Sequence, residues 1–296
     1  MQKSIFHIES NDAVARDTFR LVLRTDGPVA VCSGQFVDLD IPGYYLRRPI
    51  SVSDSLPDGV VLYYKVVGEG TKVLSGMAPG SPLELLANAP EGPVMANAPE
   101  GPAIASAPGV QVFPDAKKAS GKYLDAPAAQ RSRANCLTGL GNGFHPEKCV
   151  SDALLIGGGL GAAPLCLLAK ELLAQGKKAT AVLGFNKADE ICLADELRAL
   201  GIPVHIATMD GSVGTKGFVT DAIAAAKPVF DRFYTCGPLP MMKAVCAALS
   251  VPGEVSLEER MGCGAGFCYG CTVQTASGPR RVCADGPVFD KEEVLW

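Results

Sequence analysis

Four cysteines near the C-terminus have the spacing of an electron-transfer metal site. Cys263, Cys268 and Cys271 follow one another in C-x4-C-x2-C order, and Cys283 comes after eleven further residues. This spacing is typical of the thiolates that hold a plant-type [2Fe-2S] cluster, which moves one electron at a time. Glycines at 262, 264, 266 and 270 alternate with the cysteines, as expected where a backbone wraps tightly around a cluster.

Two other interpretations of the cysteines stay open at this point. They could be ordinary cysteines in a glycine-rich loop, or they could bind a structural zinc ion. Structural zinc sites usually repeat a C-x2-C pair, and here Cys268 and Cys271 form a single such pair.

Composition excludes several classes of function. The chain has 296 residues, enough for two ordinary domains, with 48% hydrophobic and 20% charged residues. A formal net charge of −4 and a pI near 5.5 give no basic surface for nucleic acid. The longest uncharged apolar run, residues 153–169, is interrupted by glycines and a proline, which argues against a membrane span.

The remaining cysteines and the N-terminus bear on location. The other seven cysteines have no disulfide-like spacing, which favours a reducing compartment. The first ten residues contain no apolar segment of a secretory signal. The sequence therefore predicts a cytoplasmic protein.

The pattern along the chain predicts an α+β protein with an N-terminal antiparallel β-barrel, a central α/β domain with a parallel sheet, and a small cluster-binding segment. Residues 1–86 form the barrel, with strands expected at 18–23, 34–41 and 60–67 and a short helix over 72–77 capped by Thr71. Residues 137–250 form the α/β domain and residues 251–296 the cluster segment.

Residues 87–136 interrupt this pattern. The phrase Ala-Asn-Ala-Pro-Glu-Gly-Pro at 87–93 recurs at 96–102, and a shortened third copy begins at 105. Text so rich in Pro, Gly and Ala does not easily form a helix or a strand ladder. We interpret it as an insertion looped out at the surface.

Alternating strands and helices are expected from residue 151 onward. The predicted strands are 153–156, 179–184, 203–207 and 232–236, and the predicted helices are 161–175, 189–200, 220–227 and 241–249. This alternation is typical of a parallel sheet covered by helices on both faces, with ligands at the carboxyl ends of the strands.

The turns after two of these strands could bind a dinucleotide. Gly157, Gly158, Gly159 and Gly161 lie between the first predicted strand and its helix, where glycine lets a backbone approach a pyrophosphate closely. The alternative is a tight turn needed for packing alone. Cys236 and Gly237, followed by proline, close the last strand. Taken alone they form a helix-initiating turn, but their place in the sheet makes them candidates for binding a planar nicotinamide ring.

A phrase in the barrel could bind a flavin. Arg48, Pro49, Ile50 and Ser51 combine a guanidinium for a pyrophosphate, a rigid backbone for a ring and a hydroxyl for a flavin nitrogen. A polar strand end explains these residues equally well. The strand with Tyr63, Tyr64 and Lys65 and the turn with Gly70 and Thr71 could flank the same cofactor, although such tyrosines are more often barrel packing.

Taken together, these motifs resemble the electron-transfer subunits of NAD-dependent dihydroorotate dehydrogenase, a family within the ferredoxin-reductase superfamily. The resemblance covers nearly the whole chain except about 87–136. The matching segments are 46–51, 68–71, 140–144, 155–165, 207–212, 217–221, 236–238, 256–263 and onward to 285–289.

The resemblance implies roles for individual residues. FAD would contact Arg48, Pro49, Ile50, Ser51, Tyr63, Tyr64, Lys65, Gly70 and Thr71. NAD would contact Gly157, Gly158, Gly159, Gly161, Cys236 and Gly237, and Cys263, Cys268, Cys271 and Cys283 would hold the [2Fe-2S] cluster. No catalytic side chain is expected, because the cofactors carry the redox chemistry.

The resemblance also implies a partner. Electrons taken from dihydroorotate by a catalytic subunit that carries FMN would pass through the cluster to FAD and then to NAD+, in a heterotetramer with two copies of each subunit and a role in pyrimidine biosynthesis. Two alternatives remain. One is a reductase subunit linked to a ferredoxin, a sulfide-metabolising enzyme or a hydrogenase, and the other is a non-catalytic redox sensor or scaffold.

Overall fold

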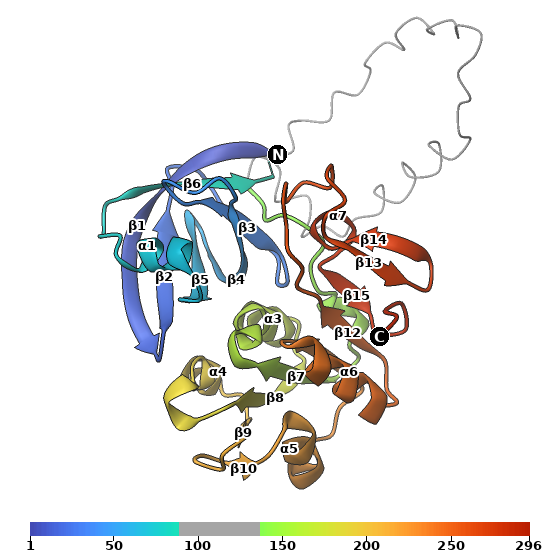
Figure 1. Ribbon diagram of the computed structural model, residues 1–296. Coiled ribbons are helices and arrows are strands. Elements are labelled where there is room, and N and C mark those ends of the chain that lie inside the picture. The colour runs from blue at the N-terminus through green and yellow to red at the C-terminus, as the bar shows by residue number, and fades with distance from the viewer. Residues whose placement is uncertain (89–136) are drawn as a thin grey trace, which may run out of the picture.

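The computed structural model describes residues 1–88 and 137–296, and its N-terminal part is a closed barrel (Figure 1). Six antiparallel strands pair in the order β1-β2-β5-β4-β3-β6. This confirms the predicted barrel. Its strands are β1 (Gln2–Ala15), β2 (Thr18–Arg24), β3 (Phe36–Asp40), β4 (Arg48–Leu56), β5 (Gly59–Lys65) and β6 (Pro82–Ala87).

The position of β5 between two cores explains why its sequence is hydrophobic at every position instead of at every second one. Side chains of successive strand residues point to opposite faces. Val60, Leu62 and Tyr64 belong to the barrel core, whereas Val61 and Tyr63 belong to a core shared with the α/β domain. Both faces are therefore buried, and every residue from 59 to 64 is apolar or aromatic.

The short helix α1 (Glu69–Ser75) begins three residues before the predicted start. Thr71 was expected to cap it but lies inside its first turn. The Thr71 hydroxyl accepts hydrogen bonds from the backbone N–H groups of Val67 (3.1 Å) and Gly68 (3.3 Å). Thr71 is thus the third residue of the helix, and its hydroxyl bonds back to the N–H of the cap residue, Gly68.

The second domain is built on a seven-stranded sheet in the order β10-β9-β8-β7-β11-β12-β15. All neighbours are parallel except β15, which runs antiparallel to β12. The strands are β7 (Asp152–Gly158), β8 (Lys178–Phe185), β9 (Val204–Thr208), β10 (Thr215–Lys216), β11 (Arg232–Cys236), β12 (Gly253–Ser256) and β15 (Val288–Asp290). The last two come from the segment 251–296, so the sheet extends into the cluster segment.

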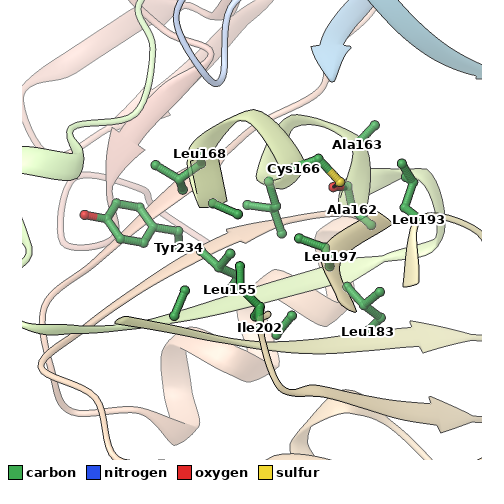
Figure 2. Close-up of a cluster of buried hydrophobic side chains, with 14 of the residues drawn as sticks. Leu155, Ala162, Ala163, Cys166, Leu168, Leu183, Leu193, Leu197, Ile202 and Tyr234 are labelled. Atoms are coloured by element: carbon green, nitrogen blue, oxygen red, sulfur yellow. Dashed lines mark hydrogen bonds between the residues drawn. The ribbon is translucent and has the colours of Figure 1, made fainter. Parts of the chain in front are cut away.

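Helices cover both faces of this sheet, as predicted. Helices α3 (Ala163–Ala174) and α4 (Ala194–Ala199) pack on the face toward the barrel, and α5 (Val219–Ala226) and α6 (Leu239–Ala248) pack on the other. Figure 2 shows the core of the first face, where Leu155 and Leu183 of the sheet meet Leu168 and Leu197 of the helices.

Two predicted helices differ from the observed ones. The helix expected from 161 begins as a 3-10 turn, η2 (Gly159–Ala162), and becomes α-helical at Ala163. The helix expected over 189–200 is divided into η3 (Ala188–Glu190) and α4, because Leu193 takes a left-handed conformation with φ of 65° and stops regular helix. A further 3-10 turn, η1 (Pro146–Lys148), precedes β7.

The cluster segment adds a hairpin and a short helix beside the sheet edge. Strands β13 (Thr272–Thr275) and β14 (Gly278–Arg281) pair antiparallel, and α7 (Val282–Asp285) follows directly. Figure 1 shows this lobe next to β15 and to the β3 side of the barrel.

Polar contacts join the barrel to the α/β domain. The Tyr63 hydroxyl donates a hydrogen bond to Glu196 Oε1 (2.8 Å), and the Ser33 hydroxyl donates one to Glu171 Oε2 (2.6 Å). Arg16 forms an ion pair with Asp189 at 3.0 Å. These contacts and the shared hydrophobic core fix the barrel against α3 and α4.

The repeats at 87–93, 96–102 and 105–109 lie almost entirely outside the described residues. The residues that flank them do pair with each other. Asn88 and Thr138 form an antiparallel bridge, in which Asn88 N–H donates to Thr138 O at 2.9 Å, and Asn88 Nδ2 also donates to Gly139 O at 2.7 Å. Within the described ranges, no helix is long and apolar enough to cross a membrane.

Candidate functional site: a cysteine loop between barrel and sheet

The hairpin β13–β14 brings distant cysteines together. Cys271 immediately precedes β13, and Cys283 is the second residue of α7, directly after β14. Because Thr272 pairs with Arg281, the two cysteines meet at the open end of the hairpin, and Cys283 N–H points at Cys271 Sγ at 3.4 Å. Both cysteines are buried, with 2% and 3% exposure.

The other two cysteines lie in the loop between β12 and β13, whose backbone N–H groups surround sulfur. Cys263 Sγ accepts hydrogen bonds from Ala265, Phe267 and Cys268 at 3.3–3.4 Å, and Cys283 Sγ accepts one from Gly266 at 3.1 Å. Positive φ angles at Gly264 and Gly266 turn these donors inward.

At Cys263 this geometry favours the thiolate, the form of cysteine that binds metal, whereas burial raises the pKa of Cys283 to about 12. Although partial burial disfavours the charged form, the N–H donors outweigh it and lower the pKa of Cys263 to about 7. The described residues contain no group of three or more His, Cys, Asp or Glu arranged to hold one metal ion. The donor set suits a larger centre, because its N–H groups converge on several separate sulfurs.

Arg281 was missed in the sequence and holds the loop to α7. Its guanidinium donates to both carboxylate oxygens of Asp285 at 2.9 and 3.0 Å and to Gly266 O at 2.8 Å. Its charge also lies 5.1 Å from the centre of the Tyr269 ring. One side chain thereby connects the segment with Cys263 and Cys268 to the helix with Cys283. Its position two residues before Cys283 is the feature of the sequence that could have indicated a role in the cysteine loop.

The flavin phrase lies on β4, the strand next to β3. Pro49, Ile50 and Ser51 pair with Asp38, Val37 and Phe36 of β3 and are partly exposed. Arg48 lies over the Tyr44 ring at 5.5 Å and against the start of α1. A Cβ on Gly70 would lie 2.7 Å from Arg48 Nη2. Because glycine has no side chain, the Arg48 guanidinium can lie directly beside the backbone N–H groups at the start of α1. These features fit a pyrophosphate.

The three β5 residues from the sequence prediction have protein partners. Tyr64 stacks on Phe19 with ring centres 5.5 Å apart and donates to Asn11 Oδ1 at 2.9 Å. Burial raises the pKa of Tyr63 and, to about 12, that of Tyr64, so both stay neutral. Lys65 lies 3.5 Å from Glu190.

The glycine turn and the last parallel strand meet at the carboxyl edge of the sheet. A Cβ on Gly161 would lie 2.2 Å from Cys236 O, and one on Gly237 would lie 2.9 Å from Gly158 N. Glycine is therefore required for this close approach. Cys236 is 1% exposed, and burial raises the pKa of its thiol, which keeps it uncharged. Around Gly159 the space is open, with no atom within 4 Å of an added Cβ.

A flavin-type barrel, a nucleotide-binding sheet and a cysteine loop define an oxidoreductase of the ferredoxin-reductase type. A family model described as the iron-sulfur cluster binding domain of dihydroorotate dehydrogenase B matches residues 258–295, and one described as an oxidoreductase NAD-binding domain matches residues 155–247.

Curated relatives identify the family. The dihydroorotate dehydrogenase B (NAD(+)) electron transfer subunit of Fusobacterium nucleatum is 34% identical over 302 residues, which cover 97% of this chain and 96% of that protein. The corresponding subunit of Lysinibacillus sphaericus is 35% identical over 300 residues, with the same coverage of both chains. The chain belongs to this family of electron transfer subunits.

Solved structures agree with the fold. A chain from the structure of an NADH-dependent reduced ferredoxin-NADP oxidoreductase, reported for flavin-based electron bifurcation, is 27% identical with a TM-score of 0.74, covering 98% of this chain and 90% of that one. The ferredoxin reductase of carbazole 1,9a-dioxygenase, at 18% identity and a TM-score of 0.55, covers 83% of this chain and 64% of that one and shares the fold. The cofactors of this oxidoreductase subunit are FAD, a [2Fe-2S] cluster and NAD.

Proposed function

We propose that this chain carries electrons between a dihydroorotate-oxidising catalytic subunit and NAD+. The single observation that carries the proposal is the match over almost the full length to electron transfer subunits of this enzyme. Cys263, Cys268, Cys271 and Cys283 hold the cluster. The N–H donors around Cys263 and Cys283 support this set, because such donors stabilise thiolate and sulfide charge.

The residues proposed for the two other cofactors lie on the barrel and on the sheet edge. FAD contacts Arg48, Pro49, Ile50, Ser51, Tyr63, Tyr64, Lys65, Gly70 and Thr71. Arg48 orients the pyrophosphate, and β4 presents its backbone to the ring. NAD contacts Gly157, Gly158, Gly159, Gly161, Cys236 and Gly237. The position of Cys236 and Gly237 at the carboxyl end of β11, directly beside the glycine turn, supports this role.

In this proposal the catalytic subunit carries FMN, and two copies of each subunit form a heterotetramer. The partner docks over the tip of the cysteine loop. Cys268 is exposed there, and its neighbours Phe267 and Tyr269 are 79% and 65% exposed. Large exposed aromatic side chains of this kind are enriched at protein interfaces. Cys149, Cys166, Cys192, Cys236 and Cys246, which lie outside the motif, form no disulfide, which supports a reducing location such as the cytoplasm.

Co-expression with a dihydroorotate dehydrogenase catalytic subunit tests the proposal. We expect a stable complex that forms orotate and reduces NAD+ when given dihydroorotate. The assignment is refuted if co-expression yields no complex and no NAD-linked formation of orotate.

A charge at the loop tip tests the docking surface separately. We expect Phe267→Glu to weaken the complex in gel filtration while the chain alone keeps its NADH-dependent dye reduction. Val229→Glu is the matched control, because Val229 is 84% exposed and lies in the loop before β11. Equal effects of both variants would argue against docking at this loop.

The similarity to the reduced ferredoxin-NADP oxidoreductase structure favours a second candidate function. In this function the chain is a reductase that exchanges electrons with ferredoxin. The two functions differ in electron donor. Reduction of the flavin by ferredoxin, in a preparation that dihydroorotate and its catalytic subunit leave oxidised, would favour this second candidate.

A further inference from the structure

Asp38 is a buried acid between the barrel and the cysteine loop. It lies in the middle of β3, where it pairs with Pro49 of the flavin phrase, and it is 2% exposed. Its Oδ1 atom has no hydrogen-bond partner within the described residues. An unpartnered carboxylate oxygen in such a place is costly and needs an explanation.

The other carboxylate oxygen faces the cysteine loop. A Cβ on Gly264 would lie 2.6 Å from Asp38 Oδ2, and Gly264 has a φ of 61°. Gly264 directly follows Cys263. The absence of a side chain at this position therefore lets the carboxylate reach the backbone of the loop that holds the first cysteine.

The neighbouring charges do not neutralise Asp38 by direct pairing. Arg47 forms ion pairs with Asp40 (3.2 Å) and with Glu84, and Arg48 donates to the carbonyl oxygens of residues 46 and 47. Burial raises the pKa of Asp38 to about 6, against the opposing effect of the two arginines. Above neutral pH the group is thus largely ionised, and a negative charge lies in a region shielded from water.

We propose that Asp38 is a positioning residue that lowers the reduction potential of the iron-sulfur cluster by holding a fixed negative charge against the cluster loop. Reduction adds one electron, and hence one negative charge, to the centre. A nearby carboxylate opposes that addition, and burial strengthens the effect because little water screens it. The same carboxylate borders β4, the strand that carries the flavin phrase.

The inference rests on the proposed cluster ligands but does not need the catalytic partner. The test uses the full chain, purified anaerobically with its cofactors and titrated at pH 8, with the cluster followed by electron paramagnetic resonance and the flavin by absorbance. Failure of the partner assignment would leave these signals unchanged, so the two proposals fail independently.

Asp38→Asn keeps the shape of the side chain and removes its charge. We expect full iron and flavin content and a cluster potential shifted to a more positive value. Asp40→Asn is the matched control, because it removes the same charge two residues along β3, where the side chain is 40% exposed and screened by solvent. Its shift should be clearly smaller. An unchanged cluster potential in Asp38→Asn, an equal shift in both variants, or a shift confined to the flavin would overturn the proposal.

A second variant covers loss of the cluster. If Asp38→Asn loses iron, Asp38→Glu, which keeps the charge, should restore the iron and the signal. If the Glu variant also lacks iron, the site serves packing alone and the proposal fails.

Discussion

At the scale of single residues, the four cysteines differ in environment although they share one motif. Cys268 is exposed at the loop tip, whereas Cys271 lies in the core of the lobe with Val282 and Leu257. Serine keeps the size of cysteine but binds iron poorly, since soft thiolate is the preferred donor. Because Cys271 is buried, water cannot take the place of its sulfur without loss of packing in the lobe.

We therefore expect Cys271→Ser to lose the cluster while the flavin remains, because the flavin phrase lies on β4 of the barrel. Iron analysis and the visible spectrum of anaerobically purified protein measure both. Cys246→Ser, outside the motif and half-buried, should keep its iron. Full iron in the Cys271 variant would move the ligand assignment elsewhere.

Glu254 is a second informative residue, because it is a fully buried carboxylate on β12. Its Oε1 lies 2.9 Å from both His145 Nδ1 and Lys148 Nζ and 3.4 Å from Arg232 Nη2. Glu254, His145 and Lys148 border a cavity of about 320 Å³ between the sheet edge and the cluster lobe. Burial opposes ionisation of Glu254, but the hydrogen bonds from His145 and Lys148 outweigh burial and lower the pKa of Glu254. The hydrogen bond to Glu254 in turn raises the pKa of His145.

The pH dependence of stability follows from these directions. The contribution of Glu254 is present above its unfolded pKa of about 4.3 and is lost as the pH falls through the lower folded value. The contribution of protonated His145 is present below its unfolded pKa of about 6.5 and is lost as the pH rises through the higher folded value. Glu254→Gln should lower the free energy of unfolding by about 2–4 kcal/mol near pH 6. Denaturant unfolding between pH 4 and 9 measures this.

The control is Glu292→Gln, whose carboxylate is 63% exposed and 3.8 Å from Lys291. An exposed pair of this kind contributes little, so its pH profile should match the wild type. A wild-type profile for Glu254→Gln as well would contradict the assigned role of the buried network.

At the scale of elements, the turn η2 shows how a glycine motif serves packing. Gly161 lets the turn approach β11 so closely that any side chain would collide with the Cys236 carbonyl. The packing interpretation thus holds for Gly161, and the binding interpretation of the motif stays a prediction. Gly159, with open space around it, remains the residue for close approach of a pyrophosphate.

Gly161→Ala should therefore weaken NAD binding on the order of tenfold to a hundredfold, because the added methyl group must displace the turn from β11. The KM for NADH in dye reduction measures the effect, with the flavin spectrum as evidence that the barrel is intact. Gly27→Ala is the control, since a Cβ there has no atom within 4 Å. An unchanged KM in Gly161→Ala would show that the turn does not position the dinucleotide.

At the scale of the whole molecule, the segments before and after the repeats pair with each other. The bridge between Asn88 and Thr138 places the two chain ends within the distance that a hairpin turn spans. Tertiary contacts of Leu137 with Val29 and of Leu140 with Phe36 then lead the chain along the barrel toward the sheet.

We accordingly expect replacement of residues 90–136 by a two-residue Asn-Gly turn to raise the free energy of unfolding by about 2 kcal/mol, since each halving of loop length recovers about 0.6 kcal/mol of closure entropy. Thermal unfolding and NADH-dependent dye reduction measure the result. An insoluble or cofactor-free deletion variant would show that the repeats contribute to the folded core.

The sequence by itself determined the features that depend on local spacing. The C-x4-C-x2-C motif predicted the cluster, and the glycine turn with the alternating strands and helices predicted the nucleotide-binding sheet. The spacing of short β-like runs predicted the barrel, because each of these features reflects neighbours along the chain. The boundaries were less predictable. Leu193 breaks a helix that its own propensity favours, and the predicted cluster segment contributes β12 and β15 to the sheet.

Tertiary structure alone decided which side chains meet across elements. Asp38 lies against Gly264, Arg281 joins Gly266 to Asp285, and Glu254 gathers His145 and Arg232, yet most of these partners are far apart in sequence. No periodicity or motif encodes such pairs, because their energies arise from burial and from the low dielectric of the folded interior. That interior exists only after barrel, sheet and cluster lobe have packed together.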